Sequence, residues 1–231
     1  MIEIATIVQA MAVFSACWAI ISGVDAWKRE FVGKRQIELA EQTLAKFFEV
    51  IDAVAFIRNP FSSTEEGKTR QRGVGETANQ SDLLDRGYIV VERYSKKETV
   101  FADFNTLKYR FMASFGAETQ QIFTDTFKTV NSIFSSARML ATHYWQPKAI
   151  GFGKPDSFQK YLDETQRHEG IFWDSGADDD EIRAQLGVIQ ERLEKITAPC
   201  FEEAMGTFTF LTKKRFGASG PNRLGTISKN P

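Results

Sequence analysis

Two histidines are the side chains in this 231-residue chain that are best suited to acid–base or metal chemistry. His168 follows Glu164 by one helical turn and precedes Glu169, and a neutral imidazole beside carboxylates can bind a metal or transfer a proton. His143 has no carboxylate in the turn before it. A di-iron helical bundle requires Glu-x-x-His on two helices, and the spacing from Glu164 to His168 is one residue too long. We therefore expect both histidines to be structural. A metal-binding or enzymatic site built from His143, His168 and neighbouring carboxylates is the alternative.

Three other segments contain suitable residue types without the spacing that the chemistry needs. The four acidic residues at 178–181 lack the alternating ligands and central glycine of a calcium loop, so they predict a helix N-terminus. The basic loop at 68–73 has arginines that match phosphate oxygens, but it is not a phosphate-binding loop, and we expect it to be solvated. Cys200 lies on an apolar helix face and predicts an inert, buried thiol. We assign no catalytic, cofactor-binding or metal-ligating residue and expect no cofactor.

Composition predicts an ordered core and gives no reason to expect a nucleic-acid partner. The chain contains 20 phenylalanines, and aromatic residues make up 13% of it. Its formal net charge of -1 provides no general attraction for nucleic acid. The two cysteines, Cys17 and Cys200, lie in such different segments that we expect no disulfide between them, which suits a reducing compartment.

The N-terminal segment is the most informative part of the sequence for location. The run from Ile4 to Val24 contains no charged residue, and as a helix it would span roughly the 30 Å hydrocarbon core of a bilayer. We expect a single-pass transmembrane anchor within residues 1–26. A buried or interfacial helix is an alternative, because Gln9 and a few hydroxyl side chains interrupt the run. A signal peptide is a further alternative, but it would begin with basic residues, and here they follow the run.

Basic residues predict the orientation of this anchor. Lys28, Arg29, Lys34 and Arg35 follow the run, whereas only three residues precede it. Positively charged flanks remain in the cytoplasm, so we expect the N-terminus outside and residues 27–231 inside. Small residues recur four apart in the run, as in helices that self-associate in lipid. The partners expected are the bilayer, through residues 4–24, and an unknown protein. A homo-oligomer is an alternative, because alanine-rich anchors also show such spacing by chance.

The rest of the chain has a helical pattern with apolar residues at steps of three and four. The first helix is expected to continue from the anchor and to end at Asn59-Pro60, followed by a loop at 59–81. Further helices are expected from Ser81 with an irregularity at 95–98, up to a stop at Gly116, then over 123–145, from about 156, and over 182–200. Pro199 should kink or split the last helix.

Together these features predict an all-α protein with one N-terminal transmembrane helix followed by an antiparallel bundle of about five helices. The expected domains are an anchor at 1–26, a cytoplasmic bundle at 27–212 and a basic, disordered tail at 213–231. The expected function is that of a membrane-tethered interaction or scaffold module without catalytic activity.

Overall fold

The computed structural model describes residues 2–146, 155–176 and 179–212, and within these it describes no side chains for 2–8, 10, 25–26, 29, 155–156 and 203–212. The predicted tail at 213–231 and most of the predicted loop at 146–155 therefore lie outside the described residues. All regular structure in the described ranges is helical, which confirms the all-α prediction, with six α-helices rather than about five. These are α1 (Ile2–Ile57), α2 (Ala78–Thr106), α3 (Lys108–Phe115), α4 (Gln120–Met139), α5 (Pro155–Phe172) and α6 (Glu181–Thr212).

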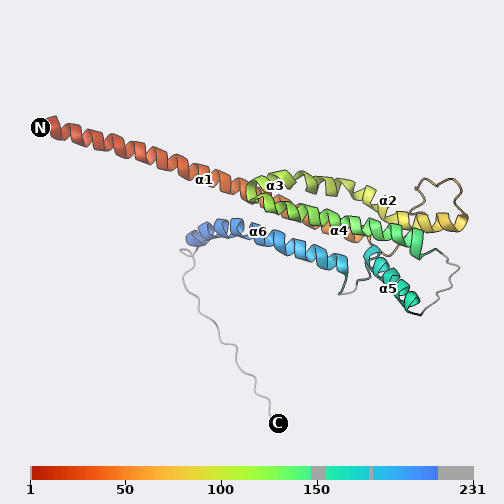
Figure 1. Ribbon diagram of the computed structural model, residues 1–231. Helices are drawn as coiled ribbons and strands as arrows, with labels where there is room; N and C mark the ends of the chain where they lie inside the picture. The colour runs from red at the N-terminus through yellow and green to blue at the C-terminus, as the bar shows by residue number, and fades with distance from the viewer. Residues whose placement is uncertain (1, 147–154, 177–178, 213–231) are drawn as a thin grey trace, which may run out of the picture.

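Helices α1, α2, α4 and α6 pack side by side as an antiparallel bundle (Figure 1). The C-terminal half of α1 packs against α2 and α6, and α4 packs against the same two helices from the other side. Helix α5 packs mainly on α4, and the short α3 joins α2 to α4. The bundle prediction is therefore confirmed.

Phenylalanine side chains fill the centre of this bundle. Phe104 is fully buried, with its ring centroid 4.7 Å from that of Phe123 and 5.7 Å from that of Phe47. Three helices meet at these rings, because Phe47 belongs to α1, Phe104 to α2 and Phe123 to α4. Each buried aromatic side chain contributes about 1.5–3 kcal/mol relative to exposure. The many phenylalanines thus supply the core, as their number predicts.

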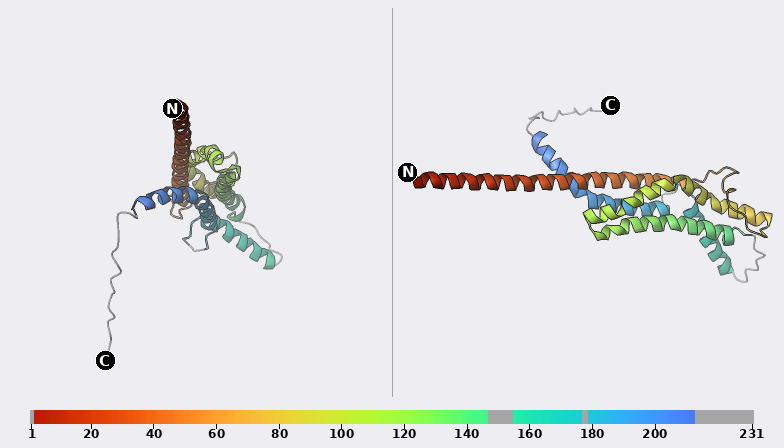
Figure 2. Two further views of the ribbon diagram at one scale, coloured as in Figure 1. Left: turned by 90° about the vertical axis from the view of Figure 1, so that its left-hand side faces the viewer. Right: turned by 90° about the horizontal axis from the view of Figure 1, so that it is seen from above.

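Helix α1 is continuous for 56 residues and extends far beyond the bundle (Figure 2). Gly33 does not interrupt it, and the buried side chains begin at Leu39. None of the helices in the described part of the chain is long and apolar enough to cross a membrane. The predicted span at 4–24 includes residues 4–8 and 10, whose side chains are not described.

Helix α2 begins earlier than predicted. Its N-cap is Thr77 rather than Ser81, because Thr77 and Gln80 form a reciprocal capping box. The hydroxyl of Thr77 accepts a hydrogen bond from the backbone N–H of Gln80 at 3.3 Å, and the Gln80 side chain accepts one from the Thr77 N–H at 3.1 Å. Ser81 is buried in the first turn and donates to Glu76.

Two other expected interruptions are also corrected. Helix α2 runs without a break through 95–98, and the break lies instead at Leu107, between α2 and α3. Helix α6 continues through Pro199, so the predicted split does not occur, and of the two predicted effects only a kink is compatible with this continuity. The predicted stop at Gly116 is confirmed, and its φ of 104° explains why glycine occupies that position.

Candidate functional site

The most unusual surface of the molecule is the arm, which we define as residues 2–32 of α1. The run from Ile4 to Val24 has no charged residue on any side of the helix, and the arm's described large apolar side chains are all at least 44% exposed. They are Met11, Val13, Phe14, Trp18, Ile20, Ile21, Val24, Trp27, Phe31 and Val32. An ordinary surface helix has one apolar stripe and one polar face, whereas a helix that is apolar all round is normally surrounded by protein or lipid. The arm is therefore the leading candidate for a functional contact.

Hydroxyl groups within the arm are satisfied by the helix itself. The Ser15 hydroxyl donates to the carbonyl of Ala12 at 2.9 Å, and the Ser22 hydroxyl donates to the carbonyl of Trp18 at 2.8 Å. Such bonds let a serine enter an apolar medium without leaving its donor unpaired. A Cβ added at Gly23 or Gly33 would meet no atom within 4 Å, so neither glycine is needed for packing inside this chain.

A polar and aromatic segment separates the arm's apolar part from the bundle. We call residues 27–35 the collar. The rings of Trp27 and Phe31 stack with centroids 5.9 Å apart, and the Arg35 guanidinium lies 5.7 Å from the Phe31 centroid. These three side chains are four residues apart and therefore line one face of the helix. Lys28 and Lys34 are exposed in the same segment.

The two histidines lie near one another around a tyrosine. His143 is exposed, and its ring meets Tyr144 edge-on at a centroid distance of 5.4 Å. His168 is half-buried, its ring centroid is 5.1 Å from that of Tyr144, and its Nδ1 lies 3.0 Å from the Ser136 hydroxyl. Burial lowers the pKa of His168, an effect that Glu164 opposes and that Arg167 reinforces. The described residues contain no group of three or more His, Cys, Asp or Glu side chains that could hold a metal ion.

Two buried arginines at the end opposite the arm, Arg58 and Arg93, were not predicted as key residues. Arg58 is 2% exposed, and its guanidinium forms a two-pronged pair with Asp180 at 2.6 and 2.9 Å. The same guanidinium donates to the carbonyls of Gly170, Ile171 and Trp173 at the end of α5. The only signal in the sequence was the position of Arg58, directly before the helix-ending Asn59-Pro60. Its partners are more than 100 residues away, and periodicity does not reveal such distant partners.

Arg93 plays the corresponding role for the end of α1. It donates to the carbonyls of Ile57, Asn59 and Phe61 and to the carboxylate of Glu66 at 2.7 Å. A guanidinium with five donors is well suited to collecting several carbonyls that a helix leaves unpaired at its C-terminus.

The basic loop is held by internal ion pairs. Arg70 pairs with Glu76 at 2.6 Å and with Asp85 at 2.9 Å, and Arg72 pairs with Asp85 at 3.0 Å. Lys68 pairs with Glu65 at 2.8 Å. Apart from half-buried Arg70 the segment is exposed, as expected for a solvated loop, and Arg70 and Arg72 also connect it to α2 through Asp85.

The acidic run at 178–181 starts a helix, as predicted. Helix α6 begins at Glu181, and Asp180 caps it by accepting a hydrogen bond from the backbone N–H of Arg183 at 2.8 Å. Burial alone would raise the pKa of Asp180, but the hydrogen bonds from Arg58 and Arg183 outweigh it and hold the pKa below its ordinary value. Asp178 lies outside the described residues. Cys200 is half-buried rather than buried, and Cys17 is exposed on the arm.

A groove of about 620 Å³ runs between α4 and α6 on the bundle surface. Thr129 donates to Gln185 across it at 3.0 Å, and Arg192 reaches Asp125 at 3.1 Å. Val188 lies in the groove and is 55% exposed. The groove thus combines an apolar side chain with charged walls, as protein-binding surfaces do.

Comparisons with protein families, with curated proteins and with solved structures found no match to this chain.

Proposed function

We propose that the protein is a membrane-tethered helical bundle, in which the arm enters the bilayer and the bundle binds another protein. The observation that carries the proposal is the arm, whose described large apolar side chains are all at least 44% exposed and whose run from Ile4 to Val24 contains no charged residue. Large apolar side chains gain about 1.5–3 kcal/mol each when they leave water. Seven of them are exposed within the uncharged run, so an apolar environment outside the chain would stabilise this part of the arm.

A bilayer is a better match for the surface of the arm than a second protein is. A protein partner usually covers one face of a helix, whereas lipid surrounds it completely. The uncharged run from Ile4 to Val24 has 21 residues, which corresponds to a helix of about 31 Å, close to the hydrocarbon thickness. The internal hydrogen bonds of Ser15 and Ser22 also suit a medium without water.

The same proposal includes an orientation. The basic collar follows the run, and basic flanks remain in the cytoplasm, so the N-terminus faces out and the bundle lies inside. The α4–α6 groove is the surface that we propose for the protein partner, because it is wide, charged at its walls and carries exposed Val188.

Fractionation of cells tests the tether. Membranes containing the full chain, or a chain of residues 27–231, are extracted with alkaline carbonate, and intact cells and opened cells are treated with protease. We expect only the full chain to resist carbonate, with its bundle digested only in opened cells. Release of the full chain by carbonate would overturn the proposal, and digestion of the bundle in intact cells would overturn the orientation.

A further inference from the structure

The collar differs from the rest of the molecule in how its cations are used. Arg58, Arg70 and Arg93 in the bundle all pair with carboxylates. Among the described side chains, neither lysine of the collar nor Arg35 forms an ion pair. Residues 27–35 carry four basic side chains and one acidic one, Glu30, so their net charge is +3, although the whole chain has -1.

The collar is also pre-organised on one face. The Arg35 guanidinium lies over the ring of Phe31, which in turn stacks on Trp27. A guanidinium held by an aromatic ring loses less side-chain freedom when it binds, and its planar donors match phosphate oxygens. Indole rings prefer the boundary between hydrocarbon and water, which places Trp27 at the level of the lipid headgroups.

The distances along the helix agree with this placement. Lys28 lies about 6 Å beyond Val24 along the axis, and the polar layer is about 5–8 Å thick on each side of a bilayer. Arg35 lies about 16 Å beyond Val24, within roughly one Debye length of the outer edge of that layer. Both ends of the collar can therefore interact with lipid phosphates.

We propose that the collar binds the headgroups of anionic phospholipids, so that these lipids gather around the arm. This inference rests on the proposed function, since the collar meets headgroups only when the arm is in a bilayer. Basic residues next to a membrane-spanning helix are attracted to the negative surface of the cytoplasmic leaflet, and the attraction decreases with added salt. Anionic lipid is thus the ligand that the charge and the aromatic ladder both favour.

Fluorescence quenching by lipids brominated in their acyl chains tests the inference. The full chain is reconstituted into vesicles that contain phosphatidylcholine and phosphatidylserine, with either one or the other brominated at equal mole fraction. The quenching of the arm's tryptophans by the two brominated lipids gives the ratio of its affinity for phosphatidylserine to that for phosphatidylcholine. We expect this ratio to be at least about two and to decrease in 0.5 M salt. The Trp27→Phe variant identifies the collar's share of the signal.

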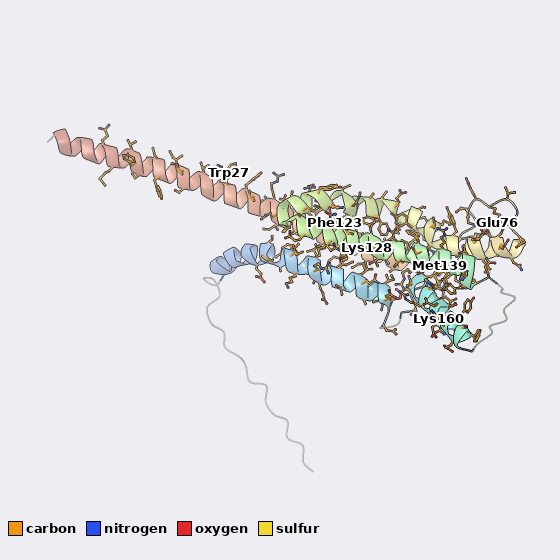
Figure 3. The ribbon with its side chains drawn as sticks, in the orientation of Figure 1. Trp27, Glu76, Phe123, Lys128, Met139 and Lys160 are labelled. Carbon is orange, nitrogen blue, oxygen red and sulfur yellow. The ribbon has the colours of Figure 1, made fainter. Side chains whose placement is uncertain are left out.

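A matched pair of triple variants separates the collar from net charge. In the variant Lys28→Gln/Lys34→Gln/Arg35→Gln, the ratio of affinities for phosphatidylserine and phosphatidylcholine should decrease to about one. The control Lys128→Gln/Arg138→Gln/Lys160→Gln removes the same charge from the bundle and should keep the preference. Figure 3 shows Lys128 and Lys160 on the bundle, away from Trp27 on the arm.

The outcomes distinguish this inference from the tether itself. Equal quenching by both lipids in the natural chain would overturn the collar inference and leave the tether standing. An equal loss of preference in both triple variants would also overturn it, because overall charge would then be the cause. Absence of quenching by either lipid would overturn the proposed function and the collar inference together.

Discussion

At the scale of single residues, the bundle is held at one end by arginines that bind helix termini. Arg58 collects carbonyls at the end of α5 and pairs with the cap of α6, while Arg93 collects carbonyls at the end of α1. No buried side-chain nitrogen or oxygen in the described residues lacks a hydrogen-bond partner. Because these networks are complete, removing one member leaves several polar groups unpaired at once.

The Arg58–Asp180 pair allows a direct test of that cost. Arg58→Met keeps the length and apolar volume of the side chain but leaves the Asp180 carboxylate buried without its cation. We expect the free energy of unfolding to decrease by about 3–5 kcal/mol. Urea unfolding of the full chain in detergent micelles, followed by circular dichroism, measures this value. Arg138→Met, at an exposed position of α4, should cost under about 0.5 kcal/mol. A similar loss of unfolding free energy in both variants would contradict the role assigned to the Arg58–Asp180 pair.

Glu76 predicts a dependence of stability on pH. Hydrogen bonds from Arg70 and from the Gly73 N–H lower its pKa to about 2, from an ordinary value of 4.5. A carboxyl group whose pKa is lower in the folded state stabilises the fold above pH 4.5, and this contribution is lost as the pH falls towards 2. Glu76→Gln should therefore lower the melting temperature at pH 7, and the difference from the natural chain should close between pH 4.5 and 2.

Thermal melts in micelles at pH 7, 4 and 2.5 follow that difference. Arg70→Gln serves as the second variant, because it removes the main hydrogen-bond donor to Glu76. The melting temperature of this variant should therefore change less between pH 4.5 and 2. A gap between the natural chain and Glu76→Gln that stays constant over the whole range would show that Glu76 does not titrate in this way.

At the scale of elements, α2 and α4 approach closely at one glycine. A Cβ added at Gly87 would lie 2.6 Å from the Cβ of Ala141 and 3.0 Å from the carbonyl oxygen of Ala137. Neither atom can move without shifting the backbone of α4 or of the turn at 140–144 that follows it. The close contact of these two helices therefore depends on the absence of a side chain at Gly87.

Gly87→Ala should consequently push α2 and α4 apart. Overpacking costs about 1–3 kcal/mol, and the better helix propensity of alanine returns about 0.5–1 kcal/mol. We expect a net loss of about 1–2 kcal/mol in urea unfolding. Gly187→Ala in α6 is the matched control, because a Cβ there meets nothing within 4 Å and should stabilise by about 0.5–1 kcal/mol. A gain of stability in both variants would refute the close-contact argument.

Sequence periodicity predicted the helices well, and their ends less well. The steps of three and four over 123–144 correspond to α4 and the turn after it, since one apolar face must meet the core. The start of α2 was misplaced because Ser81 is as good a cap by type as Thr77, and only the Gln80 side chain decides between them. Arg58 could not be paired with Asp180, because nothing local links residues 122 positions apart.

At the scale of the whole molecule, the two ends are chemically different. One end of the bundle contains Glu76, which forms an ion pair with Arg70. The opposite end continues into the arm, from which Trp27 projects (Figure 3). The buried apolar core lies in the bundle and begins at Leu39, while the described large apolar side chains of the arm are all exposed. This division agrees with one part that folds on its own core and another that needs an apolar environment.

A charge placed in the arm tests this division. Val13→Lys puts an ammonium group near the middle of the proposed span, where a charge costs about 2.5–3.5 kcal/mol on insertion. We expect a clear loss of the carbonate-resistant fraction. Val188→Lys is the control, because Val188 is similarly exposed, at 55% against 58%, but lies on the bundle. Equal carbonate resistance of both variants would count against the position of the span.

The pairing of α1 with α6 has a consequence for synthesis on the ribosome. Arg58 and Asp180 are 122 residues apart, so at about 5–20 residues per second roughly 6–24 s separate their translation. During this time the α1 face that contains Ile51 and Val54 has no α6 to cover it. A nascent chain that ends at residue 176 should therefore be digested by protease within α1 faster than the complete chain on the ribosome. Each new molecule thus exposes this apolar face for roughly 6–24 s before α6 can cover it.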